Sequence, residues 1–221
     1  MSSQVDHLVI AAATLDQGVA WCEAALGVAP GPGGQHVLMS THNRLLKIES
    51  GAFPGAYLEI IAVDPAAPLP GRARWFGLDD PSLQARIAQQ PQLVHVVART
   101  ENLDMQRWGL VNAGQQPGLP IAAQRDTPQG LLSWQILVRD DGVLPCGGAL
   151  PTLIQWAGLH PTARMPASPV ALKRLTLRGV PAQAQALLSL RGVGFETDAG
   201  PALTAELDTP RGPVTLCSEA Q

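Results

Sequence analysis

The 221-residue sequence lacks several patterns that would place it in a large functional class. It has no block of Lys and Arg, and its formal net charge is only −3, so the basic surface of a nucleic-acid-binding protein is not expected. No stretch reaches the roughly 18 apolar residues that span a bilayer, and no basic segment precedes an apolar run at the N-terminus. A phosphate-binding loop and a GxGxxG turn after a strand are also missing, which leaves nucleotide binding without support.

Cysteine is scarce as well. The three cysteines, Cys22, Cys146 and Cys217, lie far apart and form no CxxC pair. Such a set is typical of a reducing compartment and argues against a disulfide framework or a structural zinc site. Cys146 has no base partner that the sequence reveals, so it is a weak candidate nucleophile. We therefore expect a soluble, cytoplasmic protein.

Glycine and proline are abundant, with 22 and 20 residues, while 46% of the chain is hydrophobic. This composition indicates a packed core built from short elements with many turns. It favours a strand-rich α+β chain over a helical bundle.

One strand-and-turn sequence motif occurs twice. Asp6-His7-Leu8-Val9-Ile10 is followed by Thr14-Leu15-Asp16, and Leu93-Val94-His95-Val96-Val97 is followed by Asn102-Leu103-Asp104. His95 follows His7 by 88 residues, and each histidine lies mid-strand before a helix start. The spacing predicts an internal repeat.

The order of apolar runs and turn residues predicts two βαβββ modules and a third, shorter unit. We expect the first module at residues 1–65, a connection with a short helix at 66–91, the second module at 92–162 and the third unit at 163–221. In the third unit Lys173-Arg174 replaces the strand histidine, which suggests a structural role. The predicted fold class is α+β, with curled mixed sheets enclosing a cleft. Within the first module, strands at 36–40 and 44–49 should be joined by a connection at Thr41-His42-Asn43.

Four polar residues on the predicted strands could share the cleft. Glu59 lies in the apolar run Tyr57-Leu58-Glu59-Ile60-Ile61, where a carboxylate is costly unless it is paired or binds a cation. His7 lies on the first strand of that module, and His95 and Gln155 hold the corresponding positions in the second. Two imidazoles, a carboxylate and an amide oxygen form a plausible site for a divalent metal ion.

Structural roles could also explain these residues. A strand histidine is often a hydrogen-bonded core residue, and Glu59 could pair with Arg44 or Arg99. His42 could contact a substrate or simply occupy a turn, whereas His36 and His160 are expected to be ordinary surface or turn residues. Trp75, Trp134 and Trp156 could line a pocket or fill the core.

The repeated strand motif, the Leu-Asp helix start, the Glu59 strand and the tandem βαβββ order resemble those of the vicinal oxygen chelate superfamily. This superfamily includes glyoxalase I, extradiol dioxygenases and bleomycin-resistance proteins. The segments Gly33-Gly34, Thr41-His42-Asn43, Tyr57-Leu58-Glu59 and Gln155-Trp156-Ala157-Gly158 are similar to its glyoxalase-like domain family. The resemblance covers residues 5 to about 162. It implies that His7, Glu59 and His95 bind Fe, Mn, Ni or Zn. Gln155 falls where the superfamily usually has glutamate, and because glutamine is neutral it is a poor general base.

Three functions follow from this sequence. The first is a metal-dependent lyase, isomerase or dioxygenase acting on a small oxygenated substrate, with substrate contacts from His42, Asn43, Tyr57 and Trp134. The second is a metal-free protein that sequesters a small molecule in the same cleft, and the third is a dimerising scaffold. The expected partner is a small-molecule ligand, with no nucleic acid or membrane, and the sequence leaves a homodimer open.

Overall fold

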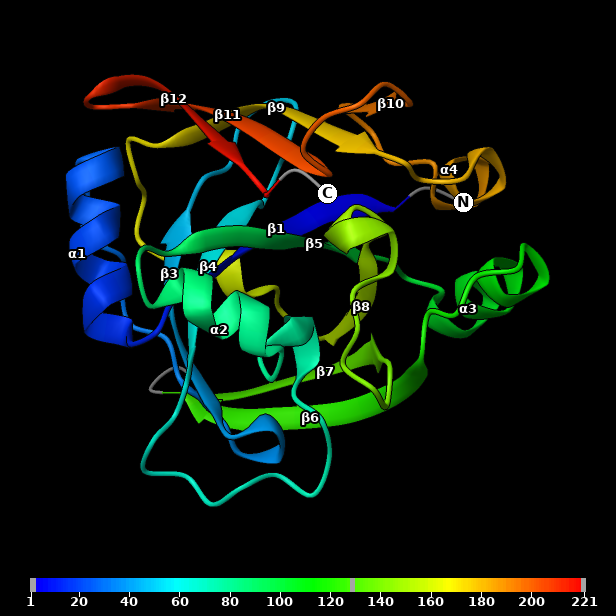
Figure 1. Cartoon of the computed structure of the whole chain (residues 1–221), viewed down its shortest axis with the longest axis horizontal. Helices are drawn as coiled ribbons and strands as arrows, with labels where there is room; N and C mark the ends of the chain where they lie inside the picture. Colours follow the sequence, from blue (N-terminus) through cyan, green and yellow to red (C-terminus); the bar gives the residue numbers. More distant parts are fainter. Residues whose placement is uncertain (1–2, 128–129, 220–221) are drawn as a thin grey trace.

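Two β-sheets and a few helices form the α+β fold of the chain, seen in a computed structural model that describes residues 3–127 and 130–219 (Figure 1). The strands are β1 (Gln4–Ala11), β2 (Gln35–His36), β3 (Thr41–Lys47), β4 (Tyr57–Val63), β5 (Gln92–Arg99), β6 (Leu119–Thr127), β7 (Gly130–Val138), β8 (Thr152–Ala157), β9 (Ala171–Arg178), β10 (Val193–Glu196), β11 (Leu203–Thr209) and β12 (Gly212–Cys217). The α-helices are α1 (Leu15–Leu26), α2 (Pro81–Ile87), α3 (Leu103–Asn112) and α4 (Ala182–Leu188).

Sheet A combines the two predicted modules in a nearly closed curl. Its strand order is β2-β3-β4-β1-β5-β8-β7-β6. The first strand of each module is parallel to the fourth, and the two first strands, β1 and β5, are antiparallel at the centre. The two halves of the sheet therefore have the same strand order, counted outward from the centre. The modules carrying His7 and His95 meet along the central strand pair.

Local sequence signals explain the element ends. The Thr14 side chain accepts a hydrogen bond from the Gln17 backbone N–H at the start of α1, and Gly27 ends the helix with φ of 74°. Both are preferred residues for these positions, because threonine satisfies a free N–H and glycine adopts the left-handed conformation without strain.

Sheet A has two apolar faces. Leu8, Ile10 and Val96 point outward, and this outer face packs against α1 and sheet B. Val9, Val97 and other alternate residues point into the curl, and this inner face packs around the connection that carries Trp75 and Phe76. The two-residue alternation of a strand thus places His7 and Glu59, which share the faces of Val9 and Ile61, inside the curl.

The third unit repeats the βαβββ order but pairs its strands differently. Sheet B has the order β10-β9-β11-β12, and β10, which directly follows α4, is parallel to β9. In sheet A the strand after the helix instead pairs in antiparallel fashion with the third strand of its module. The third unit thus has the expected βαβββ order with a different strand pairing, and its Leu175, Leu203 and Leu207 cover the outer face of the central strands.

The edge of the first module also differs from the prediction. Only Gln35–His36 forms a strand before a 3₁₀ turn at Val37–Met39, and β3 begins at Thr41. The predicted connection Thr41-His42-Asn43 is thus the start of a strand, because the tight turn at Ser40 (φ of 49°) ends earlier than the sequence suggested. Asn43 consequently points into the curl, and His42 points away from it.

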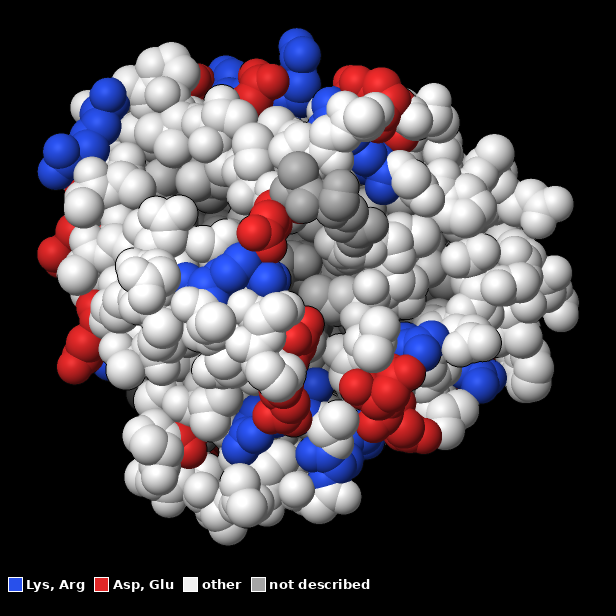
Figure 2. Space-filling view, viewed as in Figure 1, with Lys and Arg blue, Asp and Glu red and all other residues white. Residues whose placement is uncertain are grey.

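The surface carries no large region of one charge on the face shown in Figure 2, where Lys and Arg alternate with Asp and Glu. None of the helices in the described part of the chain has the length and apolar character that crossing a bilayer requires.

We expect Gly33→Ala to lower the free energy of unfolding by about 1–3 kcal/mol, the usual cost of overpacking. A Cβ at Gly33 would lie 2.0 Å from the Asn43 backbone oxygen, so the backbone must shift. Gly31→Ala is the matched control, because its Cβ would meet no atom closer than 3.4 Å. Urea denaturation of both variants measures the difference, and equal stabilities would contradict this packing.

Candidate functional site

A β-bulge places Asp6 and His7 together inside the curl. Val5 pairs with Ala98 and His7 with Val97, so Asp6 is an extra residue in β1. The bulge interrupts the alternation of side chains, and the Asp6 carboxylate accepts a 2.7 Å hydrogen bond from His7 Nδ1. Asp6 is fully buried.

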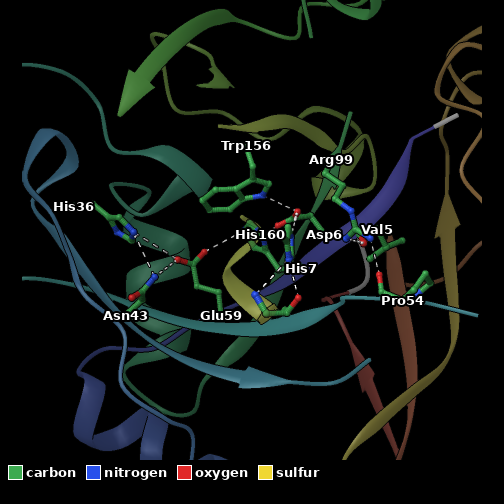
Figure 3. A network of polar contacts seen from close by, with 11 residues as sticks. Val5, Asp6, His7, His36, Asn43, Pro54, Glu59, Arg99, Trp156 and His160 are labelled. Atoms are coloured by element: carbon green, nitrogen blue, oxygen red, sulfur yellow. Dashed lines mark hydrogen bonds and ion pairs between the residues drawn. The ribbon is translucent and has the colours of Figure 1, made fainter. Parts of the chain in front are cut away.

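Glu59 faces the other nitrogen of His7. It lies on β4 opposite Val9, and its Oε2 is 3.4 Å from His7 Nε2. Asn43 Nδ2 donates a 2.5 Å hydrogen bond to Glu59 Oε1. Figure 3 shows Glu59 between Asn43 and His7, and the buried carboxylate is therefore paired on both oxygens.

Asp6 has further partners on β8 and in the turn that follows it. Trp156 Nε1 and His160 Nε2 each lie 2.9 Å from Asp6 Oδ2 (Figure 3). A buried carboxylate is stable only when its hydrogen-bonding capacity is used. Asp6 thus ties together β1, β8 and the turn that follows it.

The network sets opposite charges on His7 and its neighbours. Burial alone lowers the pKa of His7, but the hydrogen bonds to Asp6 and Glu59 outweigh burial and raise this pKa to about 9. Burial raises the pKa of Glu59, and the hydrogen bond and charge of His7 outweigh it and lower the pKa to about 2. The pKa of Asp6 is also held below its usual value, against burial, by hydrogen bonds with His160 and His7. Near neutral pH, the site therefore contains a protonated imidazole between two carboxylates.

His36 and Tyr57 surround this group. Burial lowers the pKa of His36 to about 4, so this histidine is neutral. Its Nε2 lies 3.9 Å from Glu59 Oε1, and its Nδ1 lies 3.1 Å from Thr41 Oγ1. The Tyr57 ring stacks on the His7 ring with centroids 4.6 Å apart, and burial raises the pKa of Tyr57 well above its usual value.

His95 has a different environment although it holds the equivalent repeat position. Its Nδ1 donates to the Gly148 carbonyl at 2.8 Å, and its Nε2 faces the Thr152 hydroxyl at 2.9 Å and accepts from the Thr152 backbone N–H at 3.2 Å. Burial lowers its pKa to about 3. His95 is therefore neutral, and both its ring nitrogens are occupied by protein groups.

Gln155 lies on the opposite face of the sheet from the other predicted ligands. Val97, two residues after His95, pairs with Thr152, just as Val9, two residues after His7, pairs with Glu59. Thr152 is thus the register equivalent of Glu59, and Gln155, three residues later, points outward. There its Oε1 accepts from the Leu103 backbone N–H and caps α3.

The described residues do not fit the metal site that the resemblance implies. Of the four expected ligands, only His7 and Glu59 face each other, while His95 is saturated and Gln155 is turned away. In residues 3–127 and 130–219 no group of three or more His, Cys, Asp or Glu side chains is arranged to hold a metal ion.

His7 and Glu59 line a cavity of about 30 Å³ inside the curl, which has room for about one or two water molecules. Three of the four predicted substrate contacts, Asn43, Tyr57 and Trp134, also line it. The fourth, His42, lies on the outer face of β3 and does not. The remaining walls are mainly aromatic and aliphatic, and they include Trp75, Phe76, Trp156 and Ile154.

Sequence reasoning missed several residues of this network. Asp6 had a visible signal, because it is an aspartate inside an apolar strand and the second copy has Val94 in its place. His36, His160 and Arg125 had none, since they reach the site only through the edge turn, the turn after β8 and the closure of the curl. The alternative partner for Glu59, Arg99, instead donates to the carbonyls of Val5 and Pro54 at 3.1 and 2.6 Å.

The family model of the glyoxalase-like domain matches residues 5–190. The chain belongs to the glyoxalase-like domain family. This family lies within the vicinal oxygen chelate superfamily. The match extends beyond residue 162, where the recognised motifs end, into β9 and α4 of the third unit.

Several solved structures align with this chain, and the first of them shares its fold. A hypothetical protein from Staphylococcus aureus aligns with a TM-score of 0.59 and 16% identity over 99% of this chain and 87% of that chain. Methylmalonyl-CoA epimerase from Streptomyces coelicolor, in complex with 2-nitronate-propionyl-CoA, gives 0.44 and 16% over 72% and 99%. The Mycobacterium tuberculosis epimerase gives 0.39 and 17% over 73% and 91%. No curated protein matches the sequence.

We expect the free energy of unfolding to fall as the pH rises from 6.5 through about 9. The pKa of His7 is raised from 6.5 to about 9 on folding, so its protonation stabilises the fold fully below 6.5, and this contribution of a few kcal/mol is lost as the pH passes 9. Urea denaturation of the wild type and His7→Gln across this range measures the effect as a difference. Parallel profiles would contradict a charged His7.

Proposed function

We propose that this glyoxalase-like domain is an acid–base enzyme of the isomerase or lyase type that moves a proton on a small oxygenated substrate. The observation that carries the proposal is the separation of 3.4 Å between His7 Nε2 and Glu59 Oε2 at one cavity wall. A protonated imidazole and a carboxylate at this distance can donate and accept protons on adjacent atoms of one substrate.

His7 acts as the general acid. Asp6 accepts from Nδ1 and so directs the Nε2–H into the cavity. A substrate carbonyl that receives this proton becomes an enol oxygen, and the charge that develops on it is stabilised by the imidazolium. His160 and Trp156 are positioning residues, because they hydrogen-bond to Asp6, which orients His7.

Glu59 acts as the general base. Its carboxylate takes the proton from the carbon next to the carbonyl while His7 protonates the oxygen, which yields a neutral enol. Return of a proton to the other face or to the neighbouring carbon gives the isomerised product. His7 holds the pKa of Glu59 near 2 in the free site. When a substrate oxygen takes over the hydrogen bond from His7, Glu59 loses this partner, and its basicity rises toward that of an ordinary carboxylate.

The metal-dependent enzyme that the resemblance suggested has less support from the residues of this site. A dioxygenase or a Lewis-acid enzyme would need a ligand set, and only two of the expected members converge. No step of the proposed mechanism passes through a metal.

The aromatic walls support a second candidate, a protein that binds and sequesters a small amphiphilic molecule. Trp75, Phe76, Trp134 and Trp156 give the cavity the apolar lining of a ligand pocket. Ligand-dependent stabilisation without turnover would favour this function.

The test is deuterium exchange at the carbon next to the carbonyl. The protein is incubated in D₂O with a panel of small hydroxy and oxo compounds, with chelator present, and exchange is followed by proton NMR. We expect His7→Gln and Glu59→Gln to slow exchange by about 100-fold or more, the usual contribution of a general acid or base. His42→Gln on the outer face of β3 is the matched control and should exchange at the wild-type rate.

Two results would contradict the proposal. The first is exchange that persists in both His7→Gln and Glu59→Gln. The second is exchange that requires an added divalent metal and disappears in His95→Ala, which would restore the metal site expected from the resemblance.

A further inference from the structure

A cation shares the cavity with His7 and Glu59. Arg125 lies on β6, the edge strand of sheet A at the end opposite β2 and β3. Its Nη1 donates to Asn43 Oδ1 on β3 at 3.3 Å, so the side chain crosses the seam where the curl closes. Arg125 lines the same cavity as His7 and Glu59. The guanidinium and the acid–base pair therefore face one space.

The surroundings of Arg125 fit its guanidinium closely. A Cβ at Gly34 would lie 2.6 Å from Arg125 Nη1, so the absence of a side chain there makes room for the cation. The Gly34 backbone N–H also donates to Asn43 Oδ1 at 2.8 Å. Asn43 and the space left by Gly34 thus hold Arg125 in place, and this close approach explains why glycine occurs at position 34.

The guanidinium keeps free hydrogen-bonding capacity. Arginine has five N–H donors, and one hydrogen bond of Arg125 is described, the bond to Asn43. Its Nε is buried without a partner among the described residues, and no ion pair found in that part of the chain includes Arg125. Glu59, the carboxylate in the same cavity, is engaged by His7 and Asn43. Arg125 is partly buried, and a cation whose Nε is enclosed without a partner is costly unless an anion pairs with it.

We propose that Arg125 binds the carboxylate of the substrate, so that the enzyme acts on short oxo or hydroxy carboxylic acids. A carboxylate accepts two parallel hydrogen bonds from a guanidinium, which fixes its orientation as well as its position. The carbonyl carbon attached to that carboxylate then lies toward His7 and Glu59. Because the cavity has room for about one or two water molecules, even a short acid requires its walls to move apart, and extended ligands are disfavoured further. This inference rests on the proposed function, because it assigns the substrate class of the same site.

Binding tests the inference separately from turnover. Pyruvate and lactate are the probes, methyl pyruvate and methyl lactate are their neutral counterparts, and binding is measured by titration calorimetry. We expect the acids to bind the wild type and the esters to bind at least about 10-fold more weakly. Arg125→Gln should weaken binding of the acids about 10- to 100-fold, as expected for a charge-assisted hydrogen-bonded pair.

Three further variants separate the anion site from general damage. Arg125→Lys keeps the charge but loses the paired donors, so it should bind the acids with intermediate affinity. Gly34→Ala leaves Arg125 in the chain but displaces its guanidinium, and it should lose affinity as Arg125→Gln does. Arg44→Gln on the outer face of β3 is the matched control and should bind normally. Urea denaturation confirms that each variant is folded.

The outcomes distinguish the two proposals. Acids that do not bind the wild type, esters that bind as well as acids, or unchanged binding in Arg125→Gln would overturn the anion site, and the exchange assay with His7→Gln would still decide the proton-transfer function. Acids that bind through Arg125 but show no exchange with any substrate would retain the anion site and reject the proposed enzyme.

Discussion

The site depends on one constraint, the burial of charged groups inside an apolar curl. Asp6 and Glu59 are carboxylates with almost no contact with solvent, and each would be strongly destabilising if it were unpaired. The protonated His7 lies between them and compensates both. The β-bulge at Asp6 makes this arrangement possible, because it brings two consecutive side chains of one strand into the same network.

The two modules of the repeat use their equivalent histidines in opposite ways. In the first module the carboxylates of Asp6 and Glu59 surround the imidazole and raise its pKa. In the second, Val94 replaces Asp6 and Thr152 replaces Glu59, so the imidazole is neutral and fills its hydrogen bonds with Gly148 and Thr152. One half of the curl thus carries an ionised imidazole, and the other half holds a neutral core histidine. The repeated strand can hold either a charged or a neutral histidine, because burial and hydrogen-bond partners set the charge of the imidazole.

Much of this fold could be predicted from sequence, since strand alternation and helix caps are local signals. The repeated motif predicted the two central strands, and Thr14 and Gly27 marked the ends of α1. Contacts between distant segments could not be predicted in the same way. Motif matching aligned Gln155 with Glu59, but strand pairing makes Thr152 the equivalent residue, and an offset of three residues reverses the face of a strand. Arg125 reaches the site only because the curl closes, and His160 only because the chain turns back after β8. No local sequence pattern predicts either feature.

The most direct test of this account is the protonation of His7 and His95 in the folded protein, measured by long-range ¹⁵N–¹H correlation NMR near neutral pH, with the two rings assigned by His7→Gln and His95→Gln. We expect both ring nitrogens of His7 to be protonated, whereas His95 should be neutral with its proton on Nδ1. A neutral His7, or a His95 whose Nε2 signal shifts as a metal ligand when Zn²⁺ is added, would contradict it.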